Sequence, residues 1–209
     1  MSKIYFIAGT DTGVGKTTIS VRLLKQYEKE GLSTLGIKPV ASGCHVTGGR
    51  LQNNDALALQ SASTIKLPYD AINPFAYAEP IAPHIAASKC GDDLSVEKLL
   101  NKTRDALSVD ADVILVEGVG GWCVPLNDDE LMSDFVSALN LQVILVVGMR
   151  VGCLNHAIQT FHQLCSDKIE LVSWVANCID PNMCYIGENI VALEKYFQLP
   201  CKEVVEFRV

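Results

Sequence analysis

The stretch from Ile4 to Ser20 constrains the fold of this chain more than any other. An apolar run of strand length, residues 4–8, is followed by a glycine-containing loop, residues 9–14. Gly15-Lys16-Thr17 then opens a segment whose apolar side chains have the three- and four-residue spacing typical of a helix. A strand, a glycine-rich loop, Lys-Thr and a helix in this order predict a cradle for the phosphates of a nucleotide.

The chemistry of this loop follows from its backbone. Free N–H groups at the start of a helix point at an anion, and the helix dipole favours negative charge there. Gly13 and Gly15 lack a Cβ and so let the backbone approach the phosphates closely. We expect Lys16 to reach the terminal phosphates and the Thr17 hydroxyl to bind Mg²⁺. The usual pattern has glycine where this chain has Thr10, so a chance Gly-Lys-Thr at an ordinary helix start is the alternative.

Composition limits the class of protein. The chain has 209 residues, of which 49% are hydrophobic, and no linker divides it, so we expect one domain over residues 1–209. The net charge of −7 disfavours nucleic acid and anionic membranes as partners, and no apolar run reaches the roughly 18 residues of a membrane span. Because the N-terminus leads directly into a predicted strand, we expect no signal peptide. Eight cysteines without a Cys-x-x-Cys pair disfavour a zinc site and are expected to be reduced, which predicts a cytoplasmic location.

Short apolar strands alternate with amphipathic helices along the rest of the chain. The expected strands are residues 4–8, 34–38, 113–117, 143–147 and 171–176. The expected helices are residues 17–30, 54–61 with Asn54 as cap, 94–107, 129–139, 154–164 and 185–197. Glycines mark loops at residues 41–49, and four prolines predict an irregular excursion at residues 66–84. The alternation predicts an α/β fold, a mostly parallel sheet covered by helices on both faces.

Ligands of such sheets bind at the carboxyl ends of the strands, so the polar residues there are the candidate site. Glu117 follows an all-apolar strand, and a carboxylate near a phosphate loop is the usual second holder of Mg²⁺; a solvated acid is the alternative. Asp55, in Asn53-Asn54-Asp55-Ala56, is by itself typical of a helix cap. Lys38, before Pro39 at a strand end, is by itself equally consistent with a surface lysine.

Together these residues form a series of motifs that resembles the dethiobiotin synthetase family over residues 3–200. The resemblance rests on Gly9-Thr-Asp-Thr-Gly-Val-Gly-Lys-Thr17, Lys38-Pro-Val-Ala-Ser-Gly43, Asn54-Asp-Ala-Leu-Ala-Leu-Gln60, Glu79-Pro80 with Pro83-His84, Val116-Glu-Gly-Val-Gly-Gly-Trp122, Val147-Gly148 with Gly152-Cys-Leu-Asn-His156, and Trp174-Val-Ala-Asn177. The shifted glycine of the phosphate loop is that family's own variant. The resemblance implies a three-layer sandwich of the P-loop NTPase type.

The resemblance also implies a reaction, in which 7,8-diaminopelargonate, CO₂ (or bicarbonate) and ATP give dethiobiotin, ADP and phosphate. One substrate amine captures CO₂ as a carbamate, the carbamate oxygen attacks the γ-phosphorus to form a carbamic-phosphoric anhydride, and the second amine closes the ureido ring. No protein nucleophile is required, so positioning and charge neutralisation are expected to carry the catalysis.

The family's functional residues fall on definite positions of this chain. The implied catalytic residues are Lys16 and Lys38. The implied ATP-binding residues are Gly13, Val14, Gly15, Lys16, Thr17, Thr18, Asp55, Glu117, Gly118, Val119, Gly120, Asn177 and Cys178, with Asn177 reading the adenine edge. The implied Mg²⁺ ligands are Thr17, Asp55 and Glu117. The implied substrate-binding residues are Thr12, Ser42, Gly152 and Asn155, the last two contributed by the partner subunit, so the resemblance implies a homodimer.

Two positions depart from the family pattern. Asn189 aligns where the family commonly has a tyrosine near the substrate carboxylate. The segment Pro200–Val209 stands where the family has Gly-Glu-Ile-Pro near the adenine and a further helix. Asn177 is therefore the expected adenine contact, whereas the second set of contacts is missing where residues 203–207 stand. We expect the phosphate grip of the loop to remain and the selectivity for the base to weaken.

Two other function classes share a phosphate loop of this kind. A switch ATPase of the partitioning or septum-positioning type has a second lysine in the loop, where this chain has Asp11, and often a basic surface or an amphipathic membrane tail. A small-molecule kinase usually has an arginine-rich lid, whereas the five arginines here are widely spread. ATP turnover that depends on diaminopelargonate and bicarbonate distinguishes the three classes.

Overall fold

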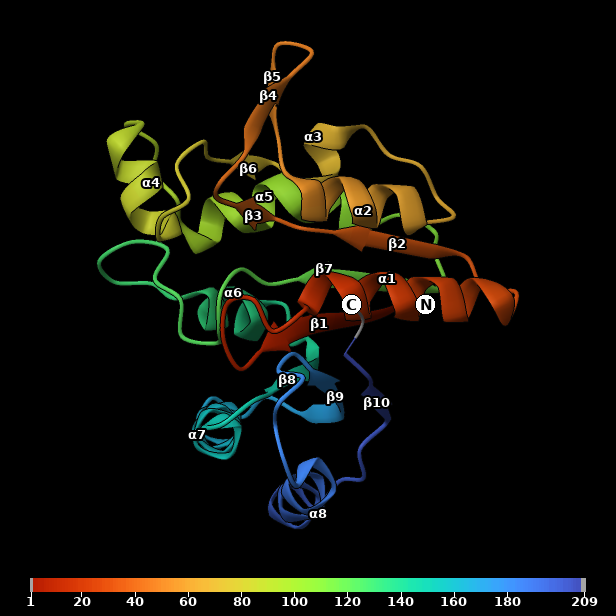
Figure 1. Ribbon diagram of the computed structural model, residues 1–209. Coiled ribbons are helices and arrows are strands. Elements are labelled where there is room, and N and C mark those ends of the chain that lie inside the picture. Colours follow the sequence, from red (N-terminus) through yellow and green to blue (C-terminus); the bar gives the residue numbers. More distant parts are fainter. Residues whose placement is uncertain (1, 208–209) are drawn as a thin grey trace.

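A six-stranded parallel sheet forms the centre of the protein in a computed structural model that describes residues 2–207 (Figure 1). Its strands are β1 (Lys3–Gly9), β2 (Thr34–Ile37), β7 (Val113–Glu117), β8 (Gln142–Met149), β9 (Leu171–Cys178) and β10 (Glu203–Val205). They lie in the order β10-β9-β8-β1-β7-β2, and every neighbouring pair is parallel. The expected α/β class is confirmed. Met1, Arg208 and Val209, at the ends of the expected single domain, lie outside the described residues.

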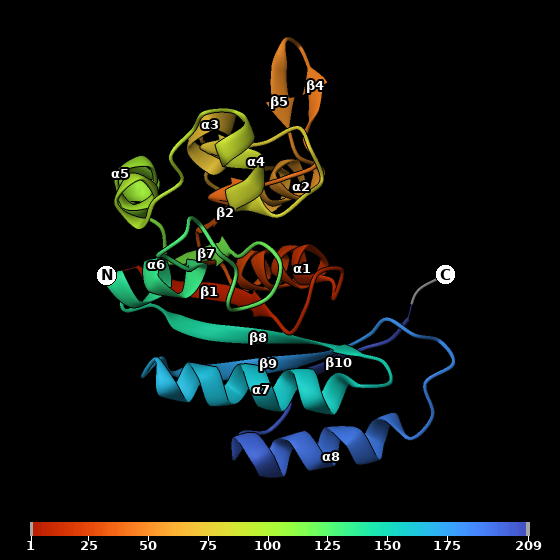
Figure 2. The same ribbon diagram turned by 90° about the vertical axis from the view of Figure 1, so that its left-hand side faces the viewer.

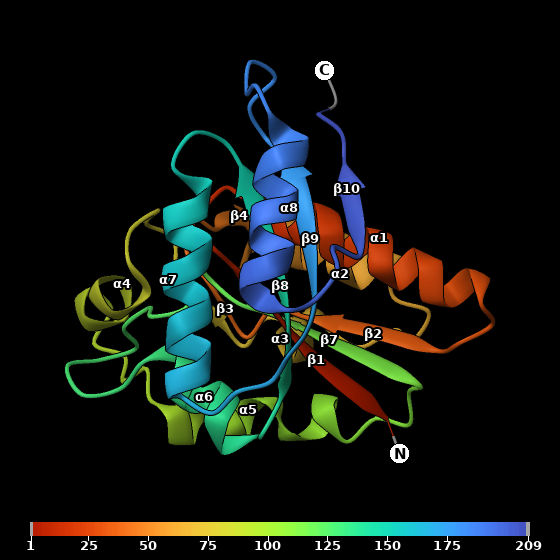
Figure 3. The ribbon, with the colours of Figure 1, turned by 90° about the horizontal axis from the view of Figure 1, so that it is seen from below.

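Helices cover both faces of this sheet. The long ones are α1 (Lys16–Lys29), α2 (Asn54–Ala62), α5 (Val96–Leu107), α7 (Cys153–Ser166) and α8 (Ile186–Phe197), and the short ones are α3 (Tyr69–Ile72), α4 (Pro83–Lys89) and α6 (Met132–Ala138). Figure 2 shows α1 and α7 on opposite sides of β8, and Figure 3 shows α8 in front of β8 and β9 with α7 beside it. The result is the three-layer sandwich that the sequence predicted.

Side-chain alternation along the strands explains why two layers of helices are needed. On β1, Phe6 and Ala8 belong to the core cluster under α5–α8, whereas Ile7 belongs to the cluster that contains Ile19 and Leu23 of α1. Successive residues of a strand point to opposite faces, so an apolar run can be buried only if both faces are covered. All three β1 side chains are at most 1% exposed.

The irregular excursion expected at residues 66–84 contains more regular structure than its prolines indicated. It holds α3, the start of α4 and the short strand β6 (Phe75–Ala76), which pairs in parallel with β3 (Val40–Ala41). Hydrogen bonds to a residue distant in the sequence hold this segment in place. The Lys38 N–H donates to the carbonyl of Ile72 at 2.9 Å, and the Asn73 side-chain amide donates to the carbonyl of Lys38 at 2.7 Å. Such pairings are not visible in local composition.

The boundaries of several other elements also differ from the expected ones, and local contacts explain why. Part of the loop expected at residues 41–49 forms, with residues 50–52, an antiparallel hairpin of β4 (His45–Thr47) and β5 (Arg50–Gln52) around Gly48 and Gly49, which both adopt positive φ (Figure 1). Asn53, and not Asn54, caps α2, since its side-chain oxygen accepts from the N–H groups of Asp55 and Ala56. Helix α6 begins at Met132 instead of residue 129, because residues 125–131 form a turn closed by a β-bridge.

The sheet brings the carboxyl ends of β1, β7, β8 and β9 to one edge, which is the place where the candidate residues gather. No helix among residues 2–207 combines the length and the apolar character that crossing a bilayer would require.

Candidate active site

The phosphate loop lies between the end of β1 and the start of α1. Gly13 has φ +74° and Gly15 has φ +86°, the left-handed region that favours glycine. A Cβ on Gly15 would lie 2.2 Å from the side-chain amide nitrogen of Asn177, so this position requires glycine on steric grounds as well. The predicted strand, loop and helix are therefore confirmed, together with the reason for two of the glycines.

Lys16 lies at the first turn of α1 and is only 8% exposed. Its ammonium donates to the carbonyl of Asp11 at 3.1 Å and to the carbonyl of Gly120, so it spans the phosphate loop and the loop after β7. Burial and, to a smaller extent, the charge of the nearby Lys38 lower the pKa of Lys16 to about 8, against the attraction of Glu117. An anion bound here would restore the charged form.

Glu117 is the centre of the polar cluster at this edge of the sheet. It is 1% exposed at the end of β7. Its Oε1 accepts from the Thr17 hydroxyl and from the Lys38 ammonium, each at 2.7 Å, and its Oε2 accepts from the Ser20 hydroxyl at 2.9 Å. Both carboxylate oxygens are thus oriented by groups from α1 and from the segment after β2, which excludes the reading of Glu117 as a solvated acid.

Lys38 is buried as well, with 5% of the residue exposed. Its ammonium lies 2.7 Å from Glu117 Oε1, 3.5 Å from Asp55 Oδ2 and 3.4 Å from the Gly118 carbonyl. Burial lowers the pKa of Lys38, but the charges of Glu117 and Asp55 and their hydrogen bonds outweigh it and raise the pKa above 10.5. Lys38 is therefore a charged group inside the site and not a surface lysine.

Asp55 reaches this cluster from the first turn of α2. The Asn53 side chain caps that helix, and the Asn53 N–H donates to the Tyr69 hydroxyl at 2.7 Å, so α2 is held against α3. About half of the Asp55 side chain stays exposed, at 48%. Asp55 thus faces a cavity on one side and Lys38 on the other. It lies in the capped first turn of α2 and is at the same time accessible to a ligand in the cavity.

The donor set at this point suits Mg²⁺. Thr17 offers a hydroxyl, and Asp55 and Glu117 offer carboxylates, which are the hard oxygen ligands that Mg²⁺ prefers. Glu117 already contacts Thr17 directly, and Lys38 joins Glu117 to Asp55. Among residues 2–207, no group of three or more His, Cys, Asp or Glu side chains forms a separate metal cage.

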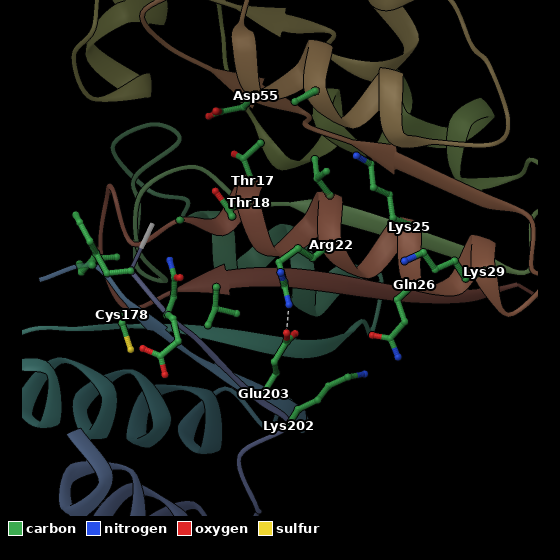
Figure 4. A pocket seen from close by; sticks show the side chains of 18 residues that line it. Thr17, Thr18, Arg22, Lys25, Gln26, Lys29, Asp55, Cys178, Lys202 and Glu203 are labelled. Carbon is green, nitrogen blue, oxygen red and sulfur yellow. Dashed lines mark hydrogen bonds and ion pairs between the residues drawn. The ribbon is translucent and has the colours of Figure 1, made fainter. Parts of the chain in front are cut away.

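Two clefts meet at the start of α1. The catalytic cleft, as we call the first, has a volume of about 750 Å³. Among the predicted residues it is lined by Thr12, Gly13, Gly15, Lys16, Thr17, Thr18, Lys38, Ser42, Asp55, Glu117, Val119 and Gly120. The second, the α1–β10 cleft, has a volume of about 1120 Å³ and is lined by Gly15, Thr17, Thr18, Asp55, Asn177, Cys178 and residues of the C-terminal segment (Figure 4).

Four predicted residues line neither cleft. Val14 is buried, and a Cβ on Gly118 would lie 2.7 Å from the Phe6 ring. Gly152 and Asn155 are exposed at the start of α7. The Arg150 guanidinium, just before them, pairs with Asp11 of the phosphate loop. The departure at Asn189 lies in α8, where its side-chain amide donates to the Tyr185 carbonyl.

Sequence reasoning missed Ser20 and Asn53. Ser20 is fully buried, donates to Glu117 and to the Lys16 carbonyl, and follows Thr17 by three residues. Residues three apart share one face of a helix, so the spacing could have identified it. Asn53 precedes Asp55 in a run of two asparagines, and only the geometry distinguishes which of them is the cap.

Comparisons with known proteins agree with this geometry. A family model described as an AAA domain matches residues 3–205. ATP-dependent dethiobiotin synthetase BioD from Cellvibrio japonicus is 48% identical over 97% of this chain and 89% of its own length. The proteins of the same name from Pseudomonas aeruginosa and Chromohalobacter salexigens are 46% and 44% identical, over 94% and 96% of this chain and 86% and 88% of their own length.

Solved structures with the same fold are more distant in sequence. The MinD cell division protein of Aquifex aeolicus has a TM-score of 0.60 at 17% identity, over 99% of this chain and 83% of that chain. A ParA family ATPase from Chlorobium tepidum has a TM-score of 0.58 at 13% identity, over 100% and 86%. These two confirm the P-loop type of α/β fold, and the relatives at 44–48% identity decide the family. The chain belongs to the ATP-dependent dethiobiotin synthetase family.

Proposed function

We propose that this protein is an ATP-dependent ligase that closes the ureido ring of dethiobiotin from 7,8-diaminopelargonate and CO₂. The observation that carries the proposal is the convergence of Lys16, Thr17, Lys38, Asp55 and Glu117 on one cleft in a member of this family. The cleft holds two ammonium groups and two carboxylates beside a phosphate loop, which suits a reaction that needs charge neutralisation and no protein nucleophile.

The nucleotide is proposed to bind across both clefts. The loop backbone from Gly13 to Thr18 would hold the phosphates at the start of α1, with Lys16 at the terminal phosphates. Gly118, Val119 and Gly120, in the loop after β7, would border the same phosphates. The base would extend toward Asn177 and Cys178 in the α1–β10 cleft, which shares Thr17 and Thr18 with the catalytic cleft.

Mg²⁺ is proposed to bind Thr17, Asp55 and Glu117. Bound there, the ion supplies charge neutralisation to the phosphate oxygens. The hydrogen bonds from Ser20 and Lys38 to Glu117 fix the orientation of that carboxylate.

Lys38 and Lys16 are proposed to stabilise the negative charge of the carbamate and the γ-phosphate. The carbamate oxygen attacks the γ-phosphorus and ADP leaves; the second amine then attacks the carbamate carbon, the ring closes and phosphate departs. Lys38 keeps its proton at neutral pH because Glu117 and Asp55 face it. Thr12 and Ser42 line the same cleft and would hydrogen-bond the substrate near its reacting end.

We propose a homodimer in which Gly152 and Asn155 serve the partner's site. Both lie exposed at the start of α7, and neither lines either of the two clefts described above. The N-terminus of a 14-residue helix suits the substrate carboxylate. A cytoplasmic location stays a prediction from the cysteine pattern of the sequence.

The proposal is tested by measuring ATP turnover with each co-substrate omitted in turn. We expect ADP formation to require diaminopelargonate, bicarbonate and Mg²⁺ together, and dethiobiotin to form in equal amount. ATP hydrolysis that proceeds without diaminopelargonate and rises with DNA or liposomes would indicate a switch ATPase instead. Phosphate transfer to a small molecule without ring closure would indicate a kinase.

A further inference from the structure

The side chain of Asn177 is bonded to the phosphate loop as well as lining the cleft proposed for the base. Asn177 is the second-last residue of β9 and is 7% exposed. Its amide nitrogen donates to the carbonyl of Val14 at 2.8 Å, although the two residues are 163 positions apart. A Cβ on Gly15 would lie 2.2 Å from the same nitrogen, so the amide packs directly against the Val14–Gly15 peptide. A contact with the adenine edge alone does not account for this arrangement.

The bond to Val14 determines which way the next N–H group of the loop points. In a planar trans peptide such as this one, the carbonyl of one residue and the N–H of the next point in opposite directions. The Val14 carbonyl faces Asn177, so the Gly15 N–H points away from Asn177. Gly15 is the N-cap of α1, and the first N–H groups of a helix have no acceptor within the helix. The Gly15 N–H is therefore a donor that the phosphate loop can present to an anion.

This peptide needs a constraint from outside the loop. Turning over a peptide unit changes φ of the residue after it, and glycine tolerates both signs of φ, so Gly15 at +86° resists such a rotation only weakly. The Val14 side chain is fixed, because it is 1% exposed and would lie within 2.8 Å of a Cβ on either Gly9 or Gly148. A fixed side chain leaves the peptide plane after it free to rotate. The hydrogen bond from Asn177 supplies the missing constraint.

We propose that Asn177 is a positioning residue for the phosphates of the nucleotide: by holding the Val14 carbonyl, it keeps the Gly15 N–H turned toward the phosphate oxygens. This inference rests on the proposed function for the location of the nucleotide. It adds to the expected adenine contact and does not replace it, because only one N–H of Asn177 is committed to Val14. The amide oxygen and the second N–H remain for the base.

The test uses inorganic tripolyphosphate, which has the phosphates of ATP and no base. Calorimetric titrations in the presence of Mg²⁺ compare tripolyphosphate and ADP for the wild type, for Asn177→Ala and for Asn177→Leu. Leucine has nearly the shape of asparagine but no donor, so this variant separates the hydrogen bond from the packing. We expect both variants to weaken tripolyphosphate roughly 10-fold, as for the loss of one hydrogen bond to a charged group, and to weaken ADP at least as much. An asparagine that only contacts the base would weaken ADP and leave tripolyphosphate unchanged.

Leu193→Ala controls for a general loss of stability. Leu193 is fully buried in α8, outside both clefts, and its truncation opens a cavity that lowers the melting temperature. Titrations are run at a temperature at which every variant is folded, and we expect this control to bind tripolyphosphate within about twofold of the wild type.

The amide resonance of Gly15 in ¹⁵N-glycine-labelled protein reports the same peptide without any ligand. We expect one sharp Gly15 signal in the wild type and a broadened or doubled signal in Asn177→Leu, whereas the signal of Gly187 in α8 stays unchanged.

Three results would overturn the inference. They are tripolyphosphate binding within about twofold of the wild type in a folded Asn177→Leu protein, an equal loss of that binding in Leu193→Ala, and an unchanged Gly15 signal in Asn177→Leu. Failure of the proposed function is distinguishable, because it would appear as wild-type ATP turnover without diaminopelargonate dependence while the titrations and the Gly15 signal stay readable.

Discussion

Glu117→Gln tests the buried charge cluster directly, because it keeps the shape of the side chain and removes only its charge. In the wild type the Lys38 ammonium is 2.7 Å from Glu117 and 3.5 Å from the half-exposed Asp55. The variant therefore leaves a buried cation with only the weaker of its two partners. Breaking a buried pair by removing one member costs about 3–5 kcal/mol, and the remaining contact with Asp55 favours the lower end of that range.

This cost converts into a measurable shift. One kcal/mol lowers the Tm of a domain of this size by about 2–4 °C, so about 3 kcal/mol predicts a fall of roughly 6–12 °C at pH 7. Turnover is expected to fall on the order of 10²-fold or more, as for other groups that stabilise transition-state charge. Glu28→Gln, the same change at an exposed position of α1, is the control and is expected to melt within about 1 °C of the wild type.

The charge explanation also predicts the direction in which the stability of Glu117→Gln, relative to the wild type, changes with pH. In the wild type the pKa of Lys38 is raised above 10.5, so its stabilising contribution is complete below pH 10.5 and is lost only above it. In Glu117→Gln, burial lowers that pKa below 10.5, and the unfolded chain then binds more protons than the folded one. The stability deficit of the variant should therefore shrink as the pH rises from 7 toward 10. Differential scanning calorimetry across this range measures it. A pH-independent deficit, or a fall in Tm no larger than that of Glu28→Gln, would refute the electrostatic account.

Three further predictions follow from the same geometry. Ser20→Ala removes the hydrogen-bond donor of one buried Glu117 oxygen, so we expect the free energy of unfolding to fall by about 1–3 kcal/mol. Ser20→Thr retains the hydroxyl and should recover part of this loss, whereas equal Tm values for the alanine variant and the wild type would contradict the role of the hydrogen bond. The pKa of about 8 at Lys16 predicts that tripolyphosphate binding weakens as the pH rises above 8 and that binding takes up a proton there; calorimetry in buffers of different ionisation enthalpy measures the uptake, and its absence would argue against Lys16 as the phosphate contact. Mixing an inactive Lys38→Leu protein with an inactive Asn155→Ala protein should restore activity, because one site of each mixed dimer is intact; no recovery after verified subunit exchange would indicate self-contained sites.

Local sequence determined the framework of the site. The apolar run at residues 4–8, the glycines and Lys16-Thr17 predicted the strand, loop and helix that the structure contains, because each depends on neighbours a few residues away. The rule that ligands bind at the carboxyl ends of parallel strands then placed Lys38 and Glu117 at one edge, where the two side chains are in contact.

Only the tertiary structure decided the contacts that orient these groups. The three-residue strand β10 is too short to show a period, and it forms because β9 offers a free edge. The bond from Ser20 to Glu117 joins residues 97 apart, and the Arg22–Glu203 pair joins residues 181 apart. Periodicity in a sequence reports which face of an element is buried, but not which side chain from another element meets it there. The residue types of the site can therefore be predicted from the sequence, whereas the orientation of their side chains depends on how the sheet and helices pack.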